Sequence, residues 1–73
     1  MTIEEAAQSY GLKRTTALVD DSIVFMVRRI YNGDSSLYFR ILRVLNPRVN
    51  WLRVPAGTSI YYLPEEAITS DLQ

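Results

Sequence analysis

The chain has 73 residues, enough for one small domain, and 48% of them are hydrophobic, as is typical of a globular protein. It contains no cysteine and no histidine, which excludes disulfides, thiolate or imidazole metal sites and a histidine general base. Eight Lys and Arg balance eight Asp and Glu, and no apolar run approaches the roughly 18 residues of a membrane span. We therefore expect no enzymatic activity, no cofactor, no metal and no membrane insertion.

The first expected element is a short helix that begins after Thr2. Thr2 followed by Glu5 has the pattern of a capping box, and Gly11 is placed to end the helix. Because this segment has few apolar residues, we treat residues 1–14 as a weakly anchored N-terminal extension. The acidic start, Met1–Glu5, does not resemble a signal peptide, which predicts that the protein is made and kept in a cytoplasm unless it leaves as part of a larger assembly.

A strand and a helix are expected next. The β-branched stretch Thr15–Val19 predicts a strand, and Asp20 or Asp21 is placed to cap the helix that follows. A helix over 23–31, ended by Asn32-Gly33, is indicated by apolar residues at helical spacing on one face: Ile23, Met26, Val27 and Ile30.

A second helix, a loop and a second strand complete the expected domain. Asp34–Ser36 is placed to cap the helix, whose apolar stripe is Tyr38, Ile41, Leu42 and Leu45. Asn46-Pro47 ends this helix, because proline disfavours helical continuation. The loop 48–57 carries the only tryptophan, Trp51, and the strand Thr58–Leu63 is closed by Pro64. Residues 65–73 form a short C-terminal tail with room for one helical turn.

Charged and apolar residues are unevenly distributed along this domain. Residues 28–53 contain a single acid, Asp34, and six arginines: Arg28, Arg29, Arg40, Arg43, Arg48 and Arg53. Several apolar residues fall outside the two core stripes: Val24, Phe25, Leu37, Phe39 and Val44. Two interpretations stand for each set. The arginines form a solvated helix face or a docking surface, and the apolar residues widen the core or form an interface.

Four segments in register resemble a LysM domain. They are Asp21-Ser22-Ile23, Tyr31-Asn32-Gly33, Asn46-Pro47 and Pro55-Ala56-Gly57-Thr58 through Pro64. The resemblance covers residues 15–64 and implies an α+β fold, with a βααβ domain at 15–64, an N-terminal helical extension at 1–14 and a C-terminal tail at 65–73. Within the superfamily, the chain is more similar to the stand-alone proteins of contractile phage tails and baseplates than to cell-wall binders.

The resemblance also implies a place for a ligand. LysM domains that bind glycans hold N-acetylglucosamine between the loop entering the first helix and the loop after the second. The family has glycine where this chain has Asp20, which adds bulk and negative charge. The glycan candidates by resemblance are Asp21, Ser22, Asn46 and Trp51. Trp51 is either a sugar platform or an interface anchor, since tryptophan is enriched in hot spots.

These observations lead to one favoured function and one alternative. The favoured function is a structural adaptor in the virion, in the tail or baseplate of a phage or a related contractile injection machine, present in multiple copies of a symmetric assembly. Its predicted contacts with other tail or baseplate proteins are Trp51, Arg48, Arg53, Arg40, Arg43, Phe25, Phe39 and Val24. The alternative is a module that binds peptidoglycan or chitin oligosaccharides. Nucleic-acid binding is disfavoured, because no recognition helix or stacking platform accompanies the arginines.

Overall fold

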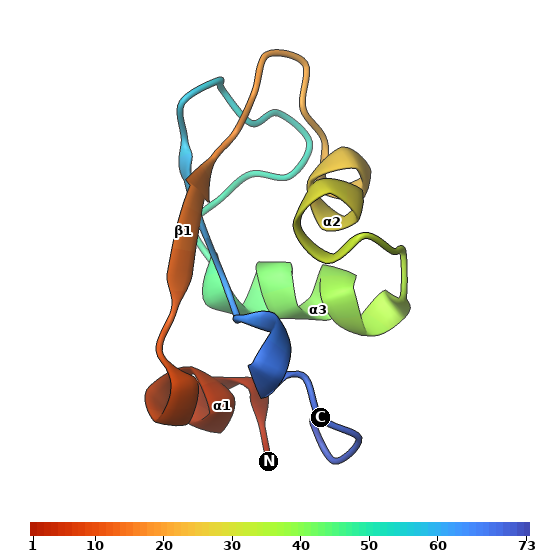
Figure 1. Ribbon diagram of the computed structural model, residues 1–73. Coiled ribbons are helices and arrows are strands. Elements are labelled where there is room, and N and C mark those ends of the chain that lie inside the picture. The colour runs from red at the N-terminus through yellow and green to blue at the C-terminus, as the bar shows by residue number, and fades with distance from the viewer.

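The computed structural model describes residues 1–73 and has the expected α+β fold. Its elements are, in chain order, α1 (Ile3–Tyr10), β1 (Lys13–Thr16), α2 (Ile23–Tyr31), α3 (Ser36–Leu45), β2 (Ser59–Tyr62) and the 3-10 helix η1 (Glu65–Ala67). The two strands pair antiparallel, with Lys13 opposite Tyr62 and Thr16 opposite Ser59. Figure 1 shows α2 and α3 on one side of this ribbon and α1 below it.

The predicted helix ends are confirmed in three places. The Thr2 hydroxyl accepts a hydrogen bond from the Glu5 N–H, and the Glu5 carboxylate accepts one from the Thr2 N–H, which completes the capping box. Gly11 ends α1 with a φ of 79°, and Asn32 ends α2 in the left-handed conformation with a φ of 56°. Glycine and short polar residues are common where a helix ends with a positive φ, because a positive φ is costly for other side chains.

The core lies where the two helical stripes meet the second strand. Met26 and Val27 of α2 and Ile41 and Leu42 of α3 are fully buried, as the spacing predicts. They pack in one cluster with the fully buried Ile60 and Leu63, which come from β2 and the residue after it. The remaining stripe residues, Ile23, Ile30, Tyr38 and Leu45, are half-buried against this cluster.

Two side chains cover the outer edge of the second strand. The amide of Asn46 donates to the carbonyl of Tyr61 at 2.9 Å and accepts from its N–H at 2.9 Å. The hydroxyl of Tyr31 makes the same pair of bonds with Leu63, both at 3.0 Å. Unpaired backbone groups at a strand edge invite another strand, so these side chains close the edge while satisfying its polar groups.

The first strand begins two residues earlier and ends three residues earlier than predicted. The prediction Thr15–Val19 is wrong at both ends, because β1 spans Lys13–Thr16. Beyond the strand, Ala17 still pairs with the segment that precedes β2. Its N–H donates to the Thr58 carbonyl, and its carbonyl accepts from the Gly57 N–H. The chain then turns, and Val19 is 78% exposed. β-branched composition indicates strand tendency, but pairing with β2 decides where the strand lies.

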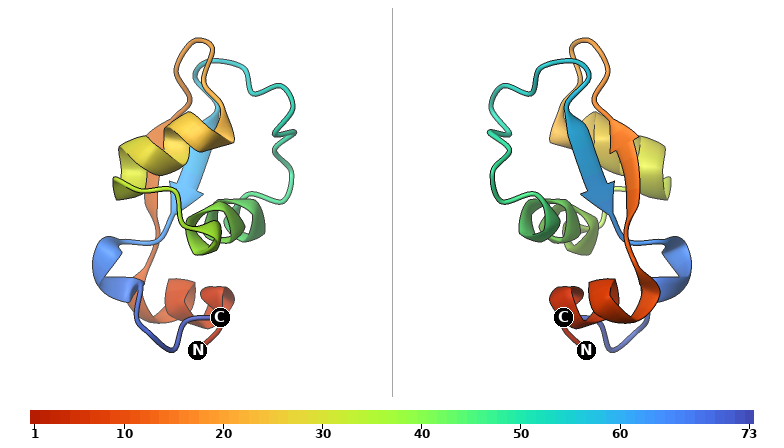
Figure 2. Two further views of the ribbon diagram at one scale, coloured as in Figure 1. Left: turned by 90° about the vertical axis from the view of Figure 1, so that its right-hand side faces the viewer. Right: turned by 90° about the vertical axis from the view of Figure 1, so that its left-hand side faces the viewer.

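The terminal segments pack into the same core as the rest of the chain, and the N-terminal helix, expected to be weakly anchored, contributes two buried residues to it. Ile3 and Ala6 of α1, Ala67 of η1 and Leu72 are all buried in the main core cluster. The Gln73 N–H donates to the Met1 carbonyl at 2.9 Å, and the Met1 amine donates to the Asp71 carbonyl at 3.2 Å. Both views of Figure 2 show the two ends of the chain side by side. We call residues 1–12 and 64–73 the terminal end.

The apolar residues outside the core stripes separate into two groups. Leu37 and Phe39 of α3 are half-buried and pack against the core, so for them the wider-core interpretation is correct. Phe25 is 57% exposed, and Val24 and Val44 are each 36% exposed. Of these five residues, only the last three leave apolar surface exposed on α2 and α3.

Candidate functional site

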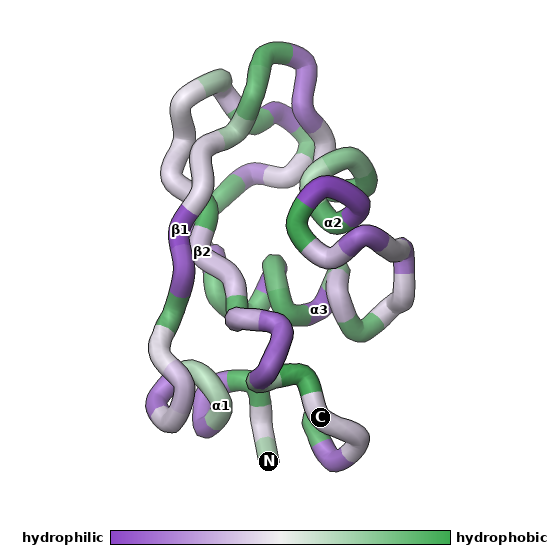
Figure 3. Tube along the Cα trace, viewed as in Figure 1, coloured by the Kyte–Doolittle hydropathy of each residue, from purple (hydrophilic) through white to green (hydrophobic).

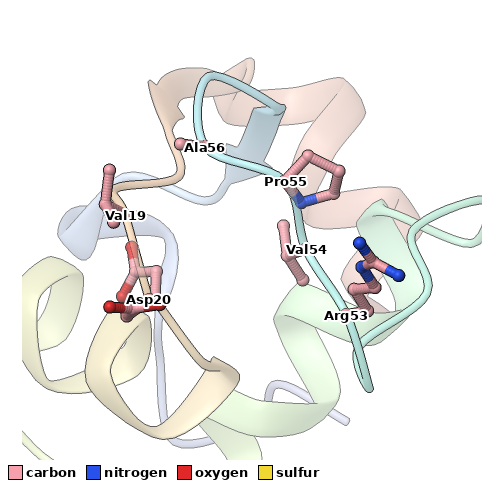
Figure 4. Close-up of a pocket in the computed structure, with 7 residues that line it drawn as sticks. Val19, Asp20, Arg53, Val54, Pro55 and Ala56 are labelled. Atoms are coloured by element: carbon pink, nitrogen blue, oxygen red, sulfur yellow. The ribbon is translucent and has the colours of Figure 1, made fainter.

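A cleft of about 400 Å³ lies at the end of the molecule opposite the termini. Its walls come from two loops far apart in the sequence, with Val19, Asp20 and Asp21 on one side and residues 53–56 on the other. Figure 4 shows Val19 and Asp20 on one loop and Val54 and Pro55 on the other, with open space between them. We call residues 17–22 and 47–58, which carry both walls, the loop end.

The backbone at Asp20 has the conformation that glycine would favour. Its φ is 58°, in the left-handed region, and it is one of two non-glycine residues there, the other being Asn32. Aspartate tolerates this region better than most side chains, although it is costlier for aspartate than for glycine. Asp20 therefore differs from a glycine at this position by its exposed side chain and its charge, while the turn itself suits either residue.

Asp21 fixes the same loop from within, and it does not cap the helix as predicted. Its carboxylate accepts from the Leu18 N–H at 3.0 Å and from the Arg29 Nη1 at 2.8 Å. The cap of α2 is instead Ser22, whose hydroxyl accepts from the Phe25 N–H. Burial alone would raise the pKa of Asp21, but the bond from Leu18 and the Arg29 guanidinium together hold that pKa below its ordinary value.

The side chains predicted for glycan contact are mostly engaged inside the protein. Asn46 is buried, and its amide nitrogen donates to the carbonyls of Leu42 and Tyr61 at 2.8 and 2.9 Å. Ser22 and Asp21 hold the turn and the start of α2. Trp51 is half-buried against the core and is not among the residues that line the cleft. The cleft walls contain no aromatic ring on which a sugar could stack.

The six arginines of the middle of the chain serve two different roles. Arg29 pairs with Asp21 and also donates to the Thr16 carbonyl, while Arg28 lies 3.5 Å from the Asp34 carboxylate. The other four make no ion pair within the chain: Arg40, Arg43, Arg48 and Arg53. All four are exposed, so their guanidinium groups are free to bind a partner.

Three of these free arginines lie on the third helix or directly after it. Arg40 and Arg43 lie one turn apart on its outward side, and Arg43 lies over the Phe39 ring at 5.9 Å. Arg48 follows the helix and lines a smaller cavity of about 290 Å³ with Leu45, Asn46, Pro47, Val49, Ser59 and Tyr61. We call Arg40, Arg43 and Arg48 the arginine face.

Exposed apolar side chains gather near the loop end. Leu52 is 97% exposed, Val19 is 78% exposed and Leu18 is 54% exposed, and Phe25 follows in the first turn of α2. Figure 3 shows hydrophobic stretches along the outer turn of the loop that precedes α2. Sequence reasoning missed Leu18, Val19 and Leu52 as surface residues. The signal for Leu52 was an apolar residue between Trp51 and Arg53 in a segment without helical or strand periodicity.

The structure contains no group of three or more His, Cys, Asp or Glu residues placed to hold a metal ion. None of its helices combines the length and the apolar character needed to cross a bilayer. The chain matches no family model, no characterised protein and no solved structure.

Proposed function

We propose that this protein is a LysM-like structural adaptor of a phage tail or baseplate, or of a related contractile injection machine. It would join neighbouring subunits through the loop end and the arginine face. The assignment to a tail rests on the sequence resemblance over residues 15–64. The adaptor role is supported by the side chains that have no partner within the chain.

The observation that carries the proposal is the combination of exposed apolar and free arginine side chains. Leu52 and Val19 expose most of their surface, although burying a leucine or valine side chain is worth about 1.5–3 kcal/mol. The four free arginines make no ion pair within the chain. Apolar and arginine side chains are the ones enriched at the centres of protein–protein interfaces. A subunit that covered the loop end and the arginine face would bury the first set and pair the second.

Leu52 is a sharper probe of this interface than Trp51. Trp51 packs against the core, so its truncation would disturb the fold as well as any contact, whereas Leu52 touches little of its own chain. Protein tagged at its terminal end should recover identified tail or baseplate subunits from purified particles that have been dissociated. We expect Leu52→Asp to reduce this recovery by about tenfold or more.

Leu12→Asp is the matched control, because Leu12 is also an exposed leucine but precedes β1 at the terminal end. It should leave recovery unchanged, and thermal melting should show that both variants remain folded. Equal recovery with Leu52→Asp and wild type would contradict an interface at the loop end. Recovery of cell-wall fragments without any tail subunit would contradict the adaptor itself.

Glycan binding is a second candidate, favoured by the position of the cleft. The cleft lies between the loop that enters α2 and the loop that follows α3, where the resemblance places an N-acetylglucosamine oligomer. Its walls lack an aromatic ring, and Asp20 occupies one side. Calorimetric titration with chitin or peptidoglycan oligomers tests this function, with Asp20→Gly as the variant that removes the side chain and keeps the turn. The absence of heat with both proteins would exclude it.

A further inference from the structure

The charges of this chain are separated between its two parts. All eight Lys and Arg lie within residues 13–63, which also hold three of the eight acids. The terminal end contains the other five acids and no Lys or Arg: Glu4, Glu5, Glu65, Glu66 and Asp71. A net charge of zero therefore conceals a basic body and an acidic end of equal and opposite side-chain charge.

Internal pairing does not remove this separation. Two of the three acids in the body are neutralised by Arg28 and Arg29, which leaves the arginine face without a counter-charge. At the terminal end, Glu5 serves the capping box and Asp71 pairs with the Met1 amine. Glu4, Glu65 and Glu66 are exposed and make no ion pair.

We propose that the partner of the arginine face is the acidic terminal end of a second copy of this chain. The inference rests on the proposed function, because it identifies an occupant for the same arginine face. Charge complementarity carries it: the face offers free guanidinium groups, and the end offers free carboxylates. A guanidinium group binds a carboxylate with two parallel hydrogen bonds. The contact therefore requires a particular orientation of the two groups as well as opposite charges.

In the proposed arrangement the contact runs head to tail between two different surfaces, and it is therefore heterologous. Each copy in a pair still has one free arginine face and one free acidic end, and addition continues until a ring closes or a filament forms. The terminal end suits this role because its segments are held together in the core, through the buried Ile3, Ala6, Ala67 and Leu72. Its carboxylates therefore project from an ordered surface.

The test is a charge swap followed by measurement of mass in solution. Light scattering or sedimentation of the wild type at low ionic strength should show species larger than a dimer, which dissociate as salt rises from about 50 mM to about 500 mM, where charges are screened within a few ångström. The two reversal variants are Arg40→Glu with Arg43→Glu, and Glu65→Lys with Glu66→Lys. Each alone should associate at least about tenfold more weakly, because its face and its end then share one sign.

Mixing the two reversal variants should restore association, because the acidic face of one then meets the basic end of the other. Lys13→Glu with Arg14→Glu makes the same charge change on β1, outside the arginine face, and should keep the wild-type behaviour. All the substituted residues are exposed, so circular dichroism should report an unchanged fold.

Three results would overturn the inference: a wild type that stays monomeric at low salt, association that survives in both reversal variants, or growth that stops at two copies. In the first case, tail subunits recovered through Leu52 would leave the adaptor function standing. In that outcome the arginine face would serve a different acidic protein. Loss of Leu52-dependent recovery together with intact head-to-tail growth would contradict the adaptor and leave this inference in place.

Discussion

The two ends of this small protein differ in how their apolar side chains are used. At the terminal end, Ile3 and Leu72 are buried although each lies close to an end of the chain. At the loop end, Leu52 and Val19 are almost fully exposed although they lie in the interior of the sequence. Position along the chain therefore does not indicate which apolar side chains are buried. One end stabilises the fold with its apolar side chains, and the other leaves them exposed to solvent.

The largest expected effect is the loss of a buried side chain at the terminal end. Ile3→Ala should lower the free energy of unfolding by about 2–4 kcal/mol, because it removes three carbon atoms from a site that is 2% exposed. Leu52→Ala at the loop end should change it by less than about 0.5 kcal/mol. Chemical denaturation measures both. Similar values for the two variants would mean that the terminal end is not part of the cooperative core.

Asn46 connects the third helix to the strand at the base of the loop end. Asn46→Ala should cost about 2–3 kcal/mol, since it leaves the Tyr61 N–H and carbonyl without partners in a partly buried place. Asn50→Ala is the matched control, because the Asn50 side chain makes one hydrogen bond, accepted from the Leu52 N–H, in an exposed loop. Thermal unfolding should separate them clearly. A cost below that of Asn50→Ala would show that water replaces the Asn46 amide.

Tyr31 has the corresponding place where the strand enters the terminal end. Tyr31→Phe keeps the ring stacked on Tyr38 but removes both bonds to Leu63, and should cost about 1–3 kcal/mol. The hydroxyl of Tyr38 makes no hydrogen bond to the protein, so Tyr38→Phe should be nearly neutral. Amide exchange at Leu63 should accelerate only in the first variant. Unchanged exchange there would contradict the edge-covering role of Tyr31.

The smallest effect concerns the loop end and depends on pH. Because the pKa of Asp21 is lowered in the fold, its charge contributes stability that is present above its ordinary pKa of 3.8 and lost as the pH falls through the folded value. Asp21→Asn should therefore cost about 1–2 kcal/mol at neutral pH and converge with the wild type in acid. Denaturant titrations across this pH range provide the comparison. A difference that stays constant in acid would contradict the ion pair with Arg29.

Local features of the sequence predicted the helices well. The bounds of α2 and the capping of α1 were correct because spacing and capping residues act within a few positions. The first strand was misplaced because its position depends on pairing with residues 59–62. The sequence underestimates the packing of the terminal end, because Ile3 and Ala6 pack with Ala67 and Leu72 in one core cluster. These residues are far apart in the sequence, so no local pattern predicts that they lie close together.

The candidate site shows the same division. Uneven charge indicated a surplus of arginine, but only the fold shows that Arg28 and Arg29 are paired and that the arginine face is free. Asn46 was selected as a ligand residue by resemblance, and its partner Tyr61 lies 15 residues away. The exposure of Leu52 depends on the course of its loop in the fold, which no local pattern of the sequence predicts.

The hydrogen bonds that join Met1 to Gln73 and to Asp71 also bear on the order of folding. They join residues at opposite ends of the sequence, so the whole chain must be organised before they can form, and the loop-closure entropy opposes them until then. We expect the strands and the two central helices to assemble first, and the terminal pairing to form last and to open first. Joining the ends with a short linker would make this contact local, and refolding should then proceed faster with the same native structure.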